Sequence, residues 1–378
     1  MDKIYKDAVE LHRKHHGKIE VASKVPLENR HDLSLAYTPG VGQVSVEIGN
    51  DPKLAREYTL KRNTIAVVSD GSAILGLGNL GPEAAIPVME GKAALFKKFA
   101  GIDAFPICLA TQDIEEIIQT VKRIAPVFGG INLEDIAAPR CFEIERRLCD
   151  ELPIPVMHDD QHGTATVVLA GVMNALKLKK MSADEARVVV NGAGAAGTAV
   201  TKLLLSYGVR DVVACDSRGA IYEGRADLND EKIQLARATN RSGKRGTLAD
   251  VIREADIFIG LSKAGVLTED MVRSMHNGPV VFALANPVPE IMPDRATAAG
   301  AFIVATGRSD FPNQINNVLA FPGIFRGALD HGIRQFTEKM FIDAAKQLAA
   351  CVIAPTPDAI FPSVFDASVV KAVAEAIR

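Results

Sequence analysis

The feature that most constrains the fold of this chain is a glycine-spaced turn between an apolar strand and an apolar helix. The turn runs from Gly192 to Gly197, between a strand-like segment at 188–190 and a helical segment at 198–205. In such a turn the first glycine permits the bend, the second lets the backbone approach a pyrophosphate, and the third lets helix and strand pack closely. Free N–H groups at the helix start suit a phosphate charge. The pattern predicts a dinucleotide site at Gly192, Gly194, Ala195, Ala196 and Gly197.

Two charged residues after the next predicted strand bear on which dinucleotide binds. Asp216 follows the glycines by about 20 residues, where an acid takes the ribose hydroxyls of NAD. Arg218 stands two residues further on and would instead neutralise the additional phosphate of NADP. Both cofactors stay open, and a nucleotide-free sheet that only contains a glycine turn is the alternative.

Length and periodicity predict the fold class. A chain of 378 residues exceeds the roughly 250–300 residues at which one hydrophobic core stops growing, so we expect two domains. Apolar strands alternate with helix-length segments in the second half, which is typical of a doubly wound parallel sheet. The predicted strands are 187–191, 211–215, 256–261, 280–285 and 302–305.

We therefore expect an α/β protein with two domains that meet near Pro153-Ile154-Pro155. Residues 1–155 would form an N-terminal α/β substrate domain, and residues 156–378 a Rossmann-type dinucleotide-binding domain that ends in packing helices. In the first domain, 64–68 reads as a buried strand. Asp113 and Glu116 are spaced as a capping box at the start of a helix that Pro126 ends.

The composition excludes several classes of protein. A net charge of -3, without a basic block, argues against a nucleic-acid surface. The chain has no apolar run near the roughly 20 residues of a membrane helix, and its first six residues are too charged for a signal sequence. The five cysteines are odd in number and scattered, as in reduced cytosolic proteins. We expect a cytoplasmic protein that binds neither nucleic acid nor a membrane.

Two adjacent acid pairs, Glu134-Asp135 and Asp159-Asp160, suggest a hard divalent cation. Adjacent side chains diverge on a strand or a helix, so we expect three acids from two irregular loops to hold the ion. Oxygen ligands without a His or Cys cluster favour Mg²⁺ or Mn²⁺ over zinc, although His158 and His162 flank the second pair. The alternative is that one pair is solvated in a turn and the other caps a helix.

Read together, these segments resemble the malic enzymes, specifically their short prokaryotic form. The matches span residues 37–323 in the family's order, and a series of eight is far more specific than any one of them. They are 37–41, 70–71 with 74–81, 90–92, 132–135, 159–160 with 163–165, the glycine turn, 285–287, and 316–317 before 321–323.

The resemblance implies oxidative decarboxylation of L-malate to pyruvate and CO₂, with reduction of NAD or NADP. The metal position of the family falls on Glu134, Asp135 and Asp160. There a Lewis acid would stabilise the developing alkoxide. The family also suggests at least a homodimer.

The family's acid–base and substrate residues also have counterparts. Lys92 matches the general base, with a pKa expected below its ordinary value of about 10.4 because of burial and a nearby dication. Asp159 would orient Lys92, and Tyr37 would protonate the enolpyruvate. The side-chain amides of Asn286 and Asn317 match positions that hold malate. Without the resemblance, Tyr37 could merely pack at a turn, and Lys92 could be a surface lysine.

One departure concerns the distal carboxylate of malate. Large animal-type enzymes carry an arginine after the Asp-Gly that corresponds to Asp70-Gly71, where this chain has Ser72-Ala73. That carboxylate clamp cannot be carried over, and its replacement stays open. Two rival functions also stay open. One is a malolactic-type lyase that converts malate to lactate without net redox change, and the other is a non-catalytic nucleotide-binding module.

Overall fold

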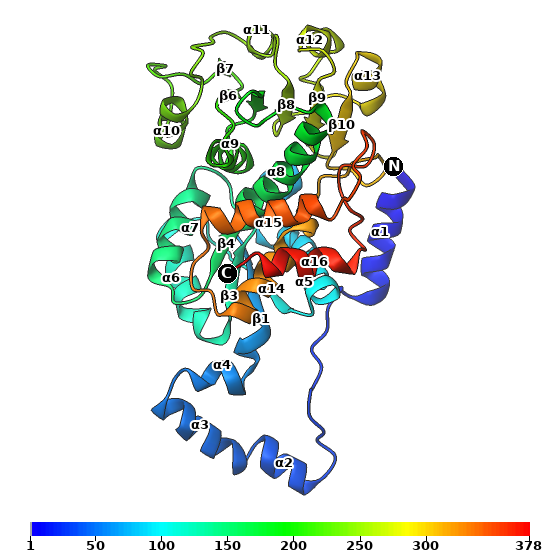
Figure 1. Ribbon diagram of the computed structural model, residues 1–378. Helices are drawn as coiled ribbons and strands as arrows, with labels where there is room; N and C mark the ends of the chain where they lie inside the picture. The colour runs from blue at the N-terminus through cyan, green and yellow to red at the C-terminus, as the bar shows by residue number, and fades with distance from the viewer. Residues whose placement is uncertain (1) are drawn as a thin grey trace.

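The computed structural model describes residues 2–378 and contains two sheets (Figure 1). The first sheet has four parallel strands in the order β2-β1-β3-β4. The predicted strand at 64–68 is β1, the second in this order. The bounds are β1 (Thr64–Ser69), β2 (Asp103–Cys108), β3 (Gly130–Leu133) and β4 (Val156–His158).

The second sheet has six strands in the order β10-β9-β8-β5-β6-β7, all parallel except β7. This arrangement confirms the predicted α/β class with a doubly wound sheet. Strand order reverses beside β5, and the crevice at such a switch point is where α/β sheets bind ligands. The bounds are β5 (Arg187–Asn191), β6 (Asp211–Asp216), β7 (Gly219–Ala220), β8 (Ile257–Gly260), β9 (Val280–Ala283) and β10 (Ile303–Thr306).

Helices cover both faces of the first sheet because successive side chains of a strand point to opposite sides. Ile65 and Val67 of β1 pack in one apolar cluster with α5 (Pro82–Ala100). Ala66 and Val68 pack in another with α6 (Ile114–Ile124) and α7 (Arg140–Glu151). Asp113 caps α6 by accepting a hydrogen bond from the Glu116 N–H at 2.9 Å, as its spacing predicts.

A long buried helix, α8 (Asp159–Lys179), links the two sheets. The last helices return to the first sheet, since the Phe321 ring lies 4.7 Å from the Phe96 ring of α5. One apolar cluster therefore runs from α5 through α8 to the C-terminal helices. These are α14 (Phe321–His331), α15 (Glu338–Ala350) and α16 (Ala367–Glu375). The domain boundary near residue 155 stays a prediction.

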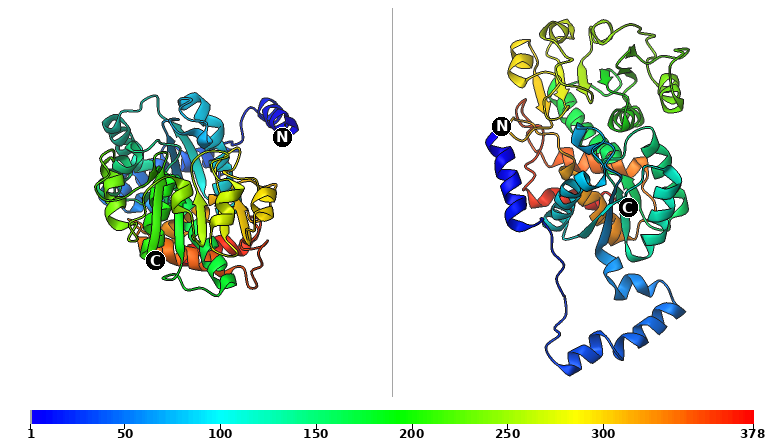
Figure 2. Two further views of the ribbon diagram at one scale, coloured as in Figure 1. Left: turned by 90° about the horizontal axis from the view of Figure 1, so that it is seen from above. Right: turned by 180° about the vertical axis from the view of Figure 1, so that it is seen from behind.

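Five further helices surround the second sheet (Figure 2). Gly194 is the N-cap of the helix that follows the glycine turn, and Gly208 caps its other end in a left-handed conformation. The helices are α9 (Ala195–Tyr207), α10 (Asp230–Ala238), α11 (Leu248–Val251), α12 (Glu269–Ser274) and α13 (Pro293–Ala298).

Residues 19–63 form an arm that projects from the body, and the views of Figures 1 and 2 agree on this. It follows α1 (Asp2–His15) and contains α2 (Arg30–Ala36), α3 (Gly40–Asn50), α4 (Leu54–Tyr58) and the 3-10 helix η1 (Leu60–Asn63). No residue of α2, α3 or α4 is buried.

Residues 2–378 contain no helix that is long and apolar enough to cross a membrane. All five cysteines are free thiols.

The glycine turn yields a stability prediction. A Cβ at Gly197 would lie 1.7 Å from the Gly192 carbonyl oxygen, whereas one at Gly194 would meet no atom within 4 Å. We expect Gly197→Ala to lower the free energy of unfolding by about 1–3 kcal/mol, the usual range for overpacking. Gly194→Ala, the matched control, should change it by less than about 0.5 kcal/mol. Chemical denaturation measures both, and equal effects would contradict the close packing at Gly197.

Candidate active site

A cleft of 720 Å³ opens at the carboxyl ends of the first sheet and extends to the loops of the second. It gathers side chains that lie far apart in the sequence. Lys92 comes from α5, Glu134 and Asp135 follow β3, and Asp160 belongs to the first turn of α8. Asn286 and Asn317 come from the loops after β9 and β10. The structure thus brings these six predicted residues to one cleft.

Lys92 is the centre of this cluster. Its Nζ lies 2.5 Å from Asp159 Oδ2 and 2.9 Å from Glu134 Oε1, and the side chain is only 6% exposed. The ring of Phe321 covers the amine, with its centroid 4.1 Å from Nζ. Burial alone lowers the pKa of Lys92, but the charges of Asp159 and Glu134 outweigh burial and raise it.

This raised pKa adds two carboxylates to what the sequence led us to expect. Burial does lower the pKa of Lys92, as expected, but without a dication Asp159 and Glu134 hold the amine in its charged form. A general base must lose that proton, so something must draw negative charge away from the amine. A dication beside Glu134 would do so, because Glu134 also lies next to the other acids.

The acid pairs occupy two different backbone settings. Asp135 follows β3 with a left-handed φ of 54°, the irregular backbone that was expected. Asp159 and Asp160 instead belong to the first turn of α8, so the expectation of a second loop was wrong; the N-cap position falls to His158, so the pair does not cap the helix either. Their side chains diverge, Asp159 toward Lys92 and Asp160 toward Asp135, whose N–H donates to Asp160 Oδ2 at 2.9 Å.

The carboxylates of Glu134, Asp135 and Asp160 lie close together in this cleft and repel one another. Burial and the charges of Asp160 and Glu134 raise the pKa of Asp135 to about 9. Asp135 Oδ2 is buried and has no hydrogen-bond partner in the described chain. Within residues 2–378 no three His, Cys, Asp or Glu side chains are already arranged around a point that could hold a metal. The oxygen donors, their mutual repulsion and the orphaned oxygen nevertheless fit a hard dication, which Asp160, Asp135 and Glu134 would hold.

The two predicted amides are placed differently. Asn317 begins the 3-10 helix η4 (Asn317–Leu319) and donates from its side chain to Asp159 Oδ2. Asn286 lines the cleft before a cis peptide bond to Pro287. Both amides are thus available to a molecule in the cleft, and Asn317 also fixes the carboxylate that holds Lys92.

Tyr37 is the predicted residue that does not reach the cleft. It follows α2 on the projecting arm, its side chain is 67% exposed, and it does not line the pocket around Lys92.

A second pocket, of 490 Å³, holds the predicted dinucleotide residues Gly192, Gly194, Asp216 and Arg218. Ser262 lines both pockets, so the two adjoin. The predicted Ala196, in the first turn of α9, lines the Lys92 cleft, and its neighbours Ala195 and Gly197 belong to the same turn. A bound dinucleotide would therefore extend from the glycine turn toward Lys92.

Asp216 is less free than the sequence suggests. Arg225 and Lys232 contact its Oδ2 at 2.5 and 2.6 Å. Burial raises the pKa of Asp216, but these hydrogen bonds outweigh it and lower the pKa to about 2. Arg218 pairs with Asp227 at 2.9 Å. The pocket thus offers both a carboxylate and several cations to the ribose end of the cofactor.

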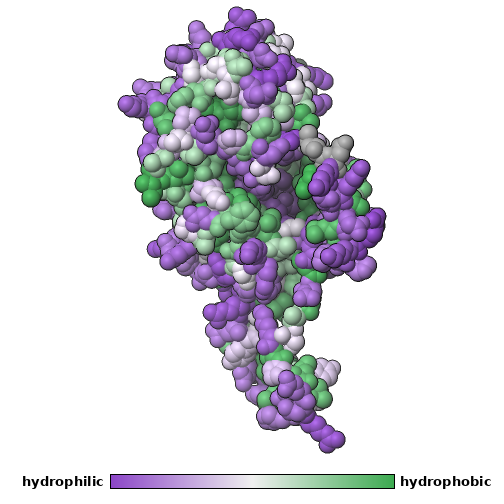
Figure 3. All heavy atoms as spheres, turned by 90° about the vertical axis from the view of Figure 1, so that its right-hand side faces the viewer, coloured by the Kyte–Doolittle hydropathy of each residue, from purple (hydrophilic) through white to green (hydrophobic). Residues whose placement is uncertain are grey.

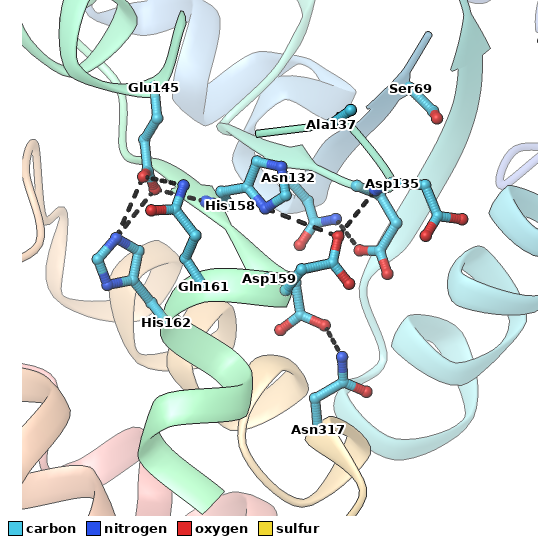
Figure 4. A network of polar contacts seen from close by, with 12 residues as sticks. Ser69, Asn132, Asp135, Ala137, Glu145, His158, Asp159, Gln161, His162 and Asn317 are labelled. Carbon is cyan, nitrogen blue, oxygen red and sulfur yellow. Dashed lines mark hydrogen bonds and ion pairs between the residues drawn. The ribbon is translucent and has the colours of Figure 1, made fainter. Parts of the chain in front are cut away.

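Sequence reasoning missed several supporting residues. Glu145 of α7 is buried and accepts hydrogen bonds from the His158 N–H at 2.6 Å and from the Gln161 amide at 2.9 Å (Figure 4). It also pairs with His162 at 3.1 Å, so one carboxylate clamps the first turn of α8. Asn132 donates to Glu134 Oε2 at 2.9 Å. No local pattern marks these contacts, because their partners come from other elements.

The sequence and fold of this chain are similar to those of several known proteins. Residues 16–149 match the family "Malic enzyme, N-terminal domain" and residues 161–378 match "Malic enzyme, NAD binding domain". The bifunctional malic/malolactic enzyme of Bacillus subtilis (strain 168) is 57% identical over 99% of this chain and 92% of its own. The NAD-dependent malic enzyme of Geobacillus stearothermophilus is 56% identical over 96% of this chain and 76% of its own. The solved NAD-dependent malic enzyme of Thermotoga maritima has a TM-score of 0.95 and 51% identity, with 98% of both chains covered.

The clamp on α8 yields a prediction. We expect Glu145→Ala to lower the free energy of unfolding by at least about 1–3 kcal/mol, because it leaves the buried His158 N–H without its acceptor. Glu143→Ala on the same helix is the control. Its carboxylate is half exposed, 3.8 Å from Arg147, and its removal should cost less than about 0.5 kcal/mol. Urea denaturation compares the two variants, and a harmless Glu145→Ala would contradict the clamp.

Proposed function

The chain belongs to the malic enzyme family, and we propose that it oxidises and decarboxylates L-malate to pyruvate and CO₂ with Mg²⁺ or Mn²⁺ and with NAD or NADP. The observation that carries the proposal is the buried pairing of Lys92 with Asp159 and Glu134, in a cleft that adjoins the dinucleotide pocket. A buried amine between carboxylates can hold or release a proton at a defined point.

Oxidation at C2 of malate requires removal of the hydroxyl proton, and we assign that task to Lys92. When bound, the dinucleotide would supply a hydride acceptor and the dication would supply positive charge for the developing alkoxide. Glu134, Asp135 and Asp160 would hold the dication. Glu134 would then hold the amine less strongly, which would lower the pKa of Lys92 and let the amine accept the proton. Asp159 and Asn317 keep the amine in place.

Amide and cationic side chains that line the cleft would orient the substrate. Asn286 and Asn317 can donate to a malate carboxylate from two loops. Lys18 also lines this cleft, with Nζ donating to the Pro87 carbonyl at 2.6 Å. Its ammonium offers positive charge for the distal carboxylate of malate. It would replace the arginine that large animal-type enzymes carry where this chain has Ser72-Ala73.

A second candidate activity is the conversion of malate to lactate. It uses the same site, and the name of the Bacillus subtilis relative, a bifunctional malic/malolactic enzyme, favours keeping it. The two activities differ in the reduced product, which is the reduced dinucleotide in the first and lactate in the second.

The test is incubation of the protein with L-malate, Mn²⁺ and either NAD or NADP. Growth of the reduced-nicotinamide absorbance together with pyruvate is the result expected. Lactate without a change in absorbance would support the lyase instead. Activity with each dinucleotide in parallel decides the cofactor.

Lys92→Met should lower kcat by about 10²–10⁴-fold, the usual contribution of acid–base catalysis, while dinucleotide affinity stays unchanged. The control is Lys97→Met on the same helix, whose side chain is 63% exposed and pairs with Asp103. It should keep near-normal turnover. A Lys92→Met variant that turns over normally would remove Lys92 from the chemistry.

Metal binding can be measured without turnover, by calorimetric titration of Mn²⁺ into the protein. Asp160→Asn should weaken Mn²⁺ affinity by at least about 10–100-fold, because it removes a proposed ligand. Asp159→Asn is its isosteric neighbour and should weaken binding much less, because Asp159 faces Lys92. The reverse order, or no Mn²⁺ binding by the unaltered protein, would refute the ligand assignment.

A further inference from the structure

One buried carboxylate beside the second sheet takes no part in the proposed reaction. Glu290 lies between β9 and α13 and is 0% exposed. Hydrophilic side chains gather at the top of Figure 3, the end of the molecule that holds the second sheet, so charged groups in this region commonly face water. Burial raises the pKa of Glu290, and hydrogen bonds from Ala285 and Ser262 lower it only in part. A carboxylate kept in such a place needs a physical reason.

The two carboxylate oxygens of Glu290 bind two different loops. Oε1 accepts the Ser262 N–H at 2.9 Å, in the loop after β8, and Oε2 accepts the Ala285 N–H at 3.0 Å, in the loop after β9. The Leu267 N–H also donates to the Glu290 carbonyl oxygen at 3.1 Å. Because one side chain satisfies a backbone donor in each loop, it fixes the position of one loop relative to the other.

The last residue of β8 leaves room for this carboxylate. An added Cβ at Gly260 would lie 2.5 Å from the carboxyl carbon of Glu290 and 2.6 Å from its Oε1. Gly260 does not have a left-handed φ, so the space that Glu290 occupies, and not the backbone conformation, requires a glycine here. The strand and the buried side chain are therefore fitted to each other.

The two loops meet where the dinucleotide and malate would meet. Ser262 lines both the cleft and the dinucleotide pocket, and its hydroxyl accepts a hydrogen bond from the Asn191 side chain at 2.8 Å. Ala285 lines the cleft and precedes Asn286, the amide proposed to hold malate. Through Glu290, hydrogen bonds therefore connect Asn191 with Ala285 across the carboxyl ends of β5, β8 and β9, which are neighbours in the sheet.

We propose that Glu290 is a positioning residue that sets the distance between the nicotinamide of the dinucleotide and C2 of malate. Glu290 lines neither pocket, and it acts through Ser262 on the dinucleotide and through the loop of Ala285 on malate. The inference rests on the proposed function, because hydride transfer needs reacting atoms about 3–3.5 Å apart. A misplacement of about 1 Å costs on the order of 100-fold in rate.

Glu290→Gln tests this role with an isosteric change. The amide keeps one acceptor oxygen but turns an NH₂ group toward the second backbone donor, so one loop loses its anchor. We expect kcat to fall by about 10–100-fold. The Kd of the reduced dinucleotide, measured by its fluorescence, should change by less than about tenfold, because the glycine turn and Asp216 are untouched.

Two readouts separate positioning from a loss of folded protein. With L-malate deuterated at C2, the isotope effect on kcat/KM should be larger in Glu290→Gln than in the unaltered protein, because poorer alignment makes hydride transfer limit the rate more strongly. The emission of the bound reduced nicotinamide should also shift, because the ring changes its surroundings. A smaller fraction of folded molecules would alter neither readout.

Asp256→Asn is the matched control at the other end of β8. Asp256 is 4% exposed, accepts the Arg187 N–H at 3.0 Å and lines neither pocket. Its replacement should lower the melting temperature, as Glu290→Gln does, but leave the isotope effect and the emission unchanged. A normal isotope effect and normal emission in Glu290→Gln, or equal changes in both variants, would overturn the proposal.

If Glu290→Gln fails to fold, Glu290→Asp replaces it. This variant keeps the charge and both acceptor oxygens but withdraws them by one methylene group, so both readouts should change in the same direction, and unchanged readouts overturn the proposal.

Absence of malate oxidation by the unaltered protein would refute the proposed function, and the emission of the bound reduced dinucleotide would still decide the role of Glu290. A shift in Glu290→Gln without one in Asp256→Asn supports that role, and equal emission overturns it. An unaltered protein that binds no reduced dinucleotide would overturn both.

Discussion

The pairing of the buried Lys92 ammonium with two carboxylates is the interaction on which the cleft depends. A charge removed from water costs several kcal/mol unless it is compensated, so Lys92, Asp159 and Glu134 are tolerable only together. Because these three side chains need one another, α5, the end of β3 and the start of α8 must meet at Lys92. A proton handled there is shielded from solvent, and its affinity responds strongly to any charge placed beside Glu134.

The rest of the fold fixes the position of Lys92 relative to the dinucleotide pocket. The C-terminal helices return to α5, and Phe321 covers both the Lys92 amine and Phe96. Asn317, from a loop of the second sheet, bonds Asp159 of α8. Because contacts from both sheets converge on one lysine, displacement of either sheet would disturb the amine. The close approach of Gly197 to Gly192 fixes the start of α9 in the same manner.

Sequence patterns predicted those structural features that depend on residues close together in the chain. The glycine turn, the strands of the second sheet and the Asp113 cap all depend on neighbours in sequence. The start of α8 at Asp159 was missed because its stabilising acceptor, Glu145, lies 13 residues before the His158 N–H that it binds. The resemblance named Tyr37 and Lys92, but no sequence pattern shows which side of a sheet an arm leaves. The raised pKa of Lys92 likewise depends on carboxylates from two other elements.

The most direct measurement of the central interaction is an NMR pH titration of the Lys92 ε-amino group, with Lys92→Met used to assign its signal. In the metal-free protein the amine should remain protonated well above the ordinary lysine pKa of about 10.4, because two carboxylates face it. Saturating Mg²⁺ should lower its pKa. An amine that titrates below about 10.4 without metal, or is indifferent to Mg²⁺, would contradict the account.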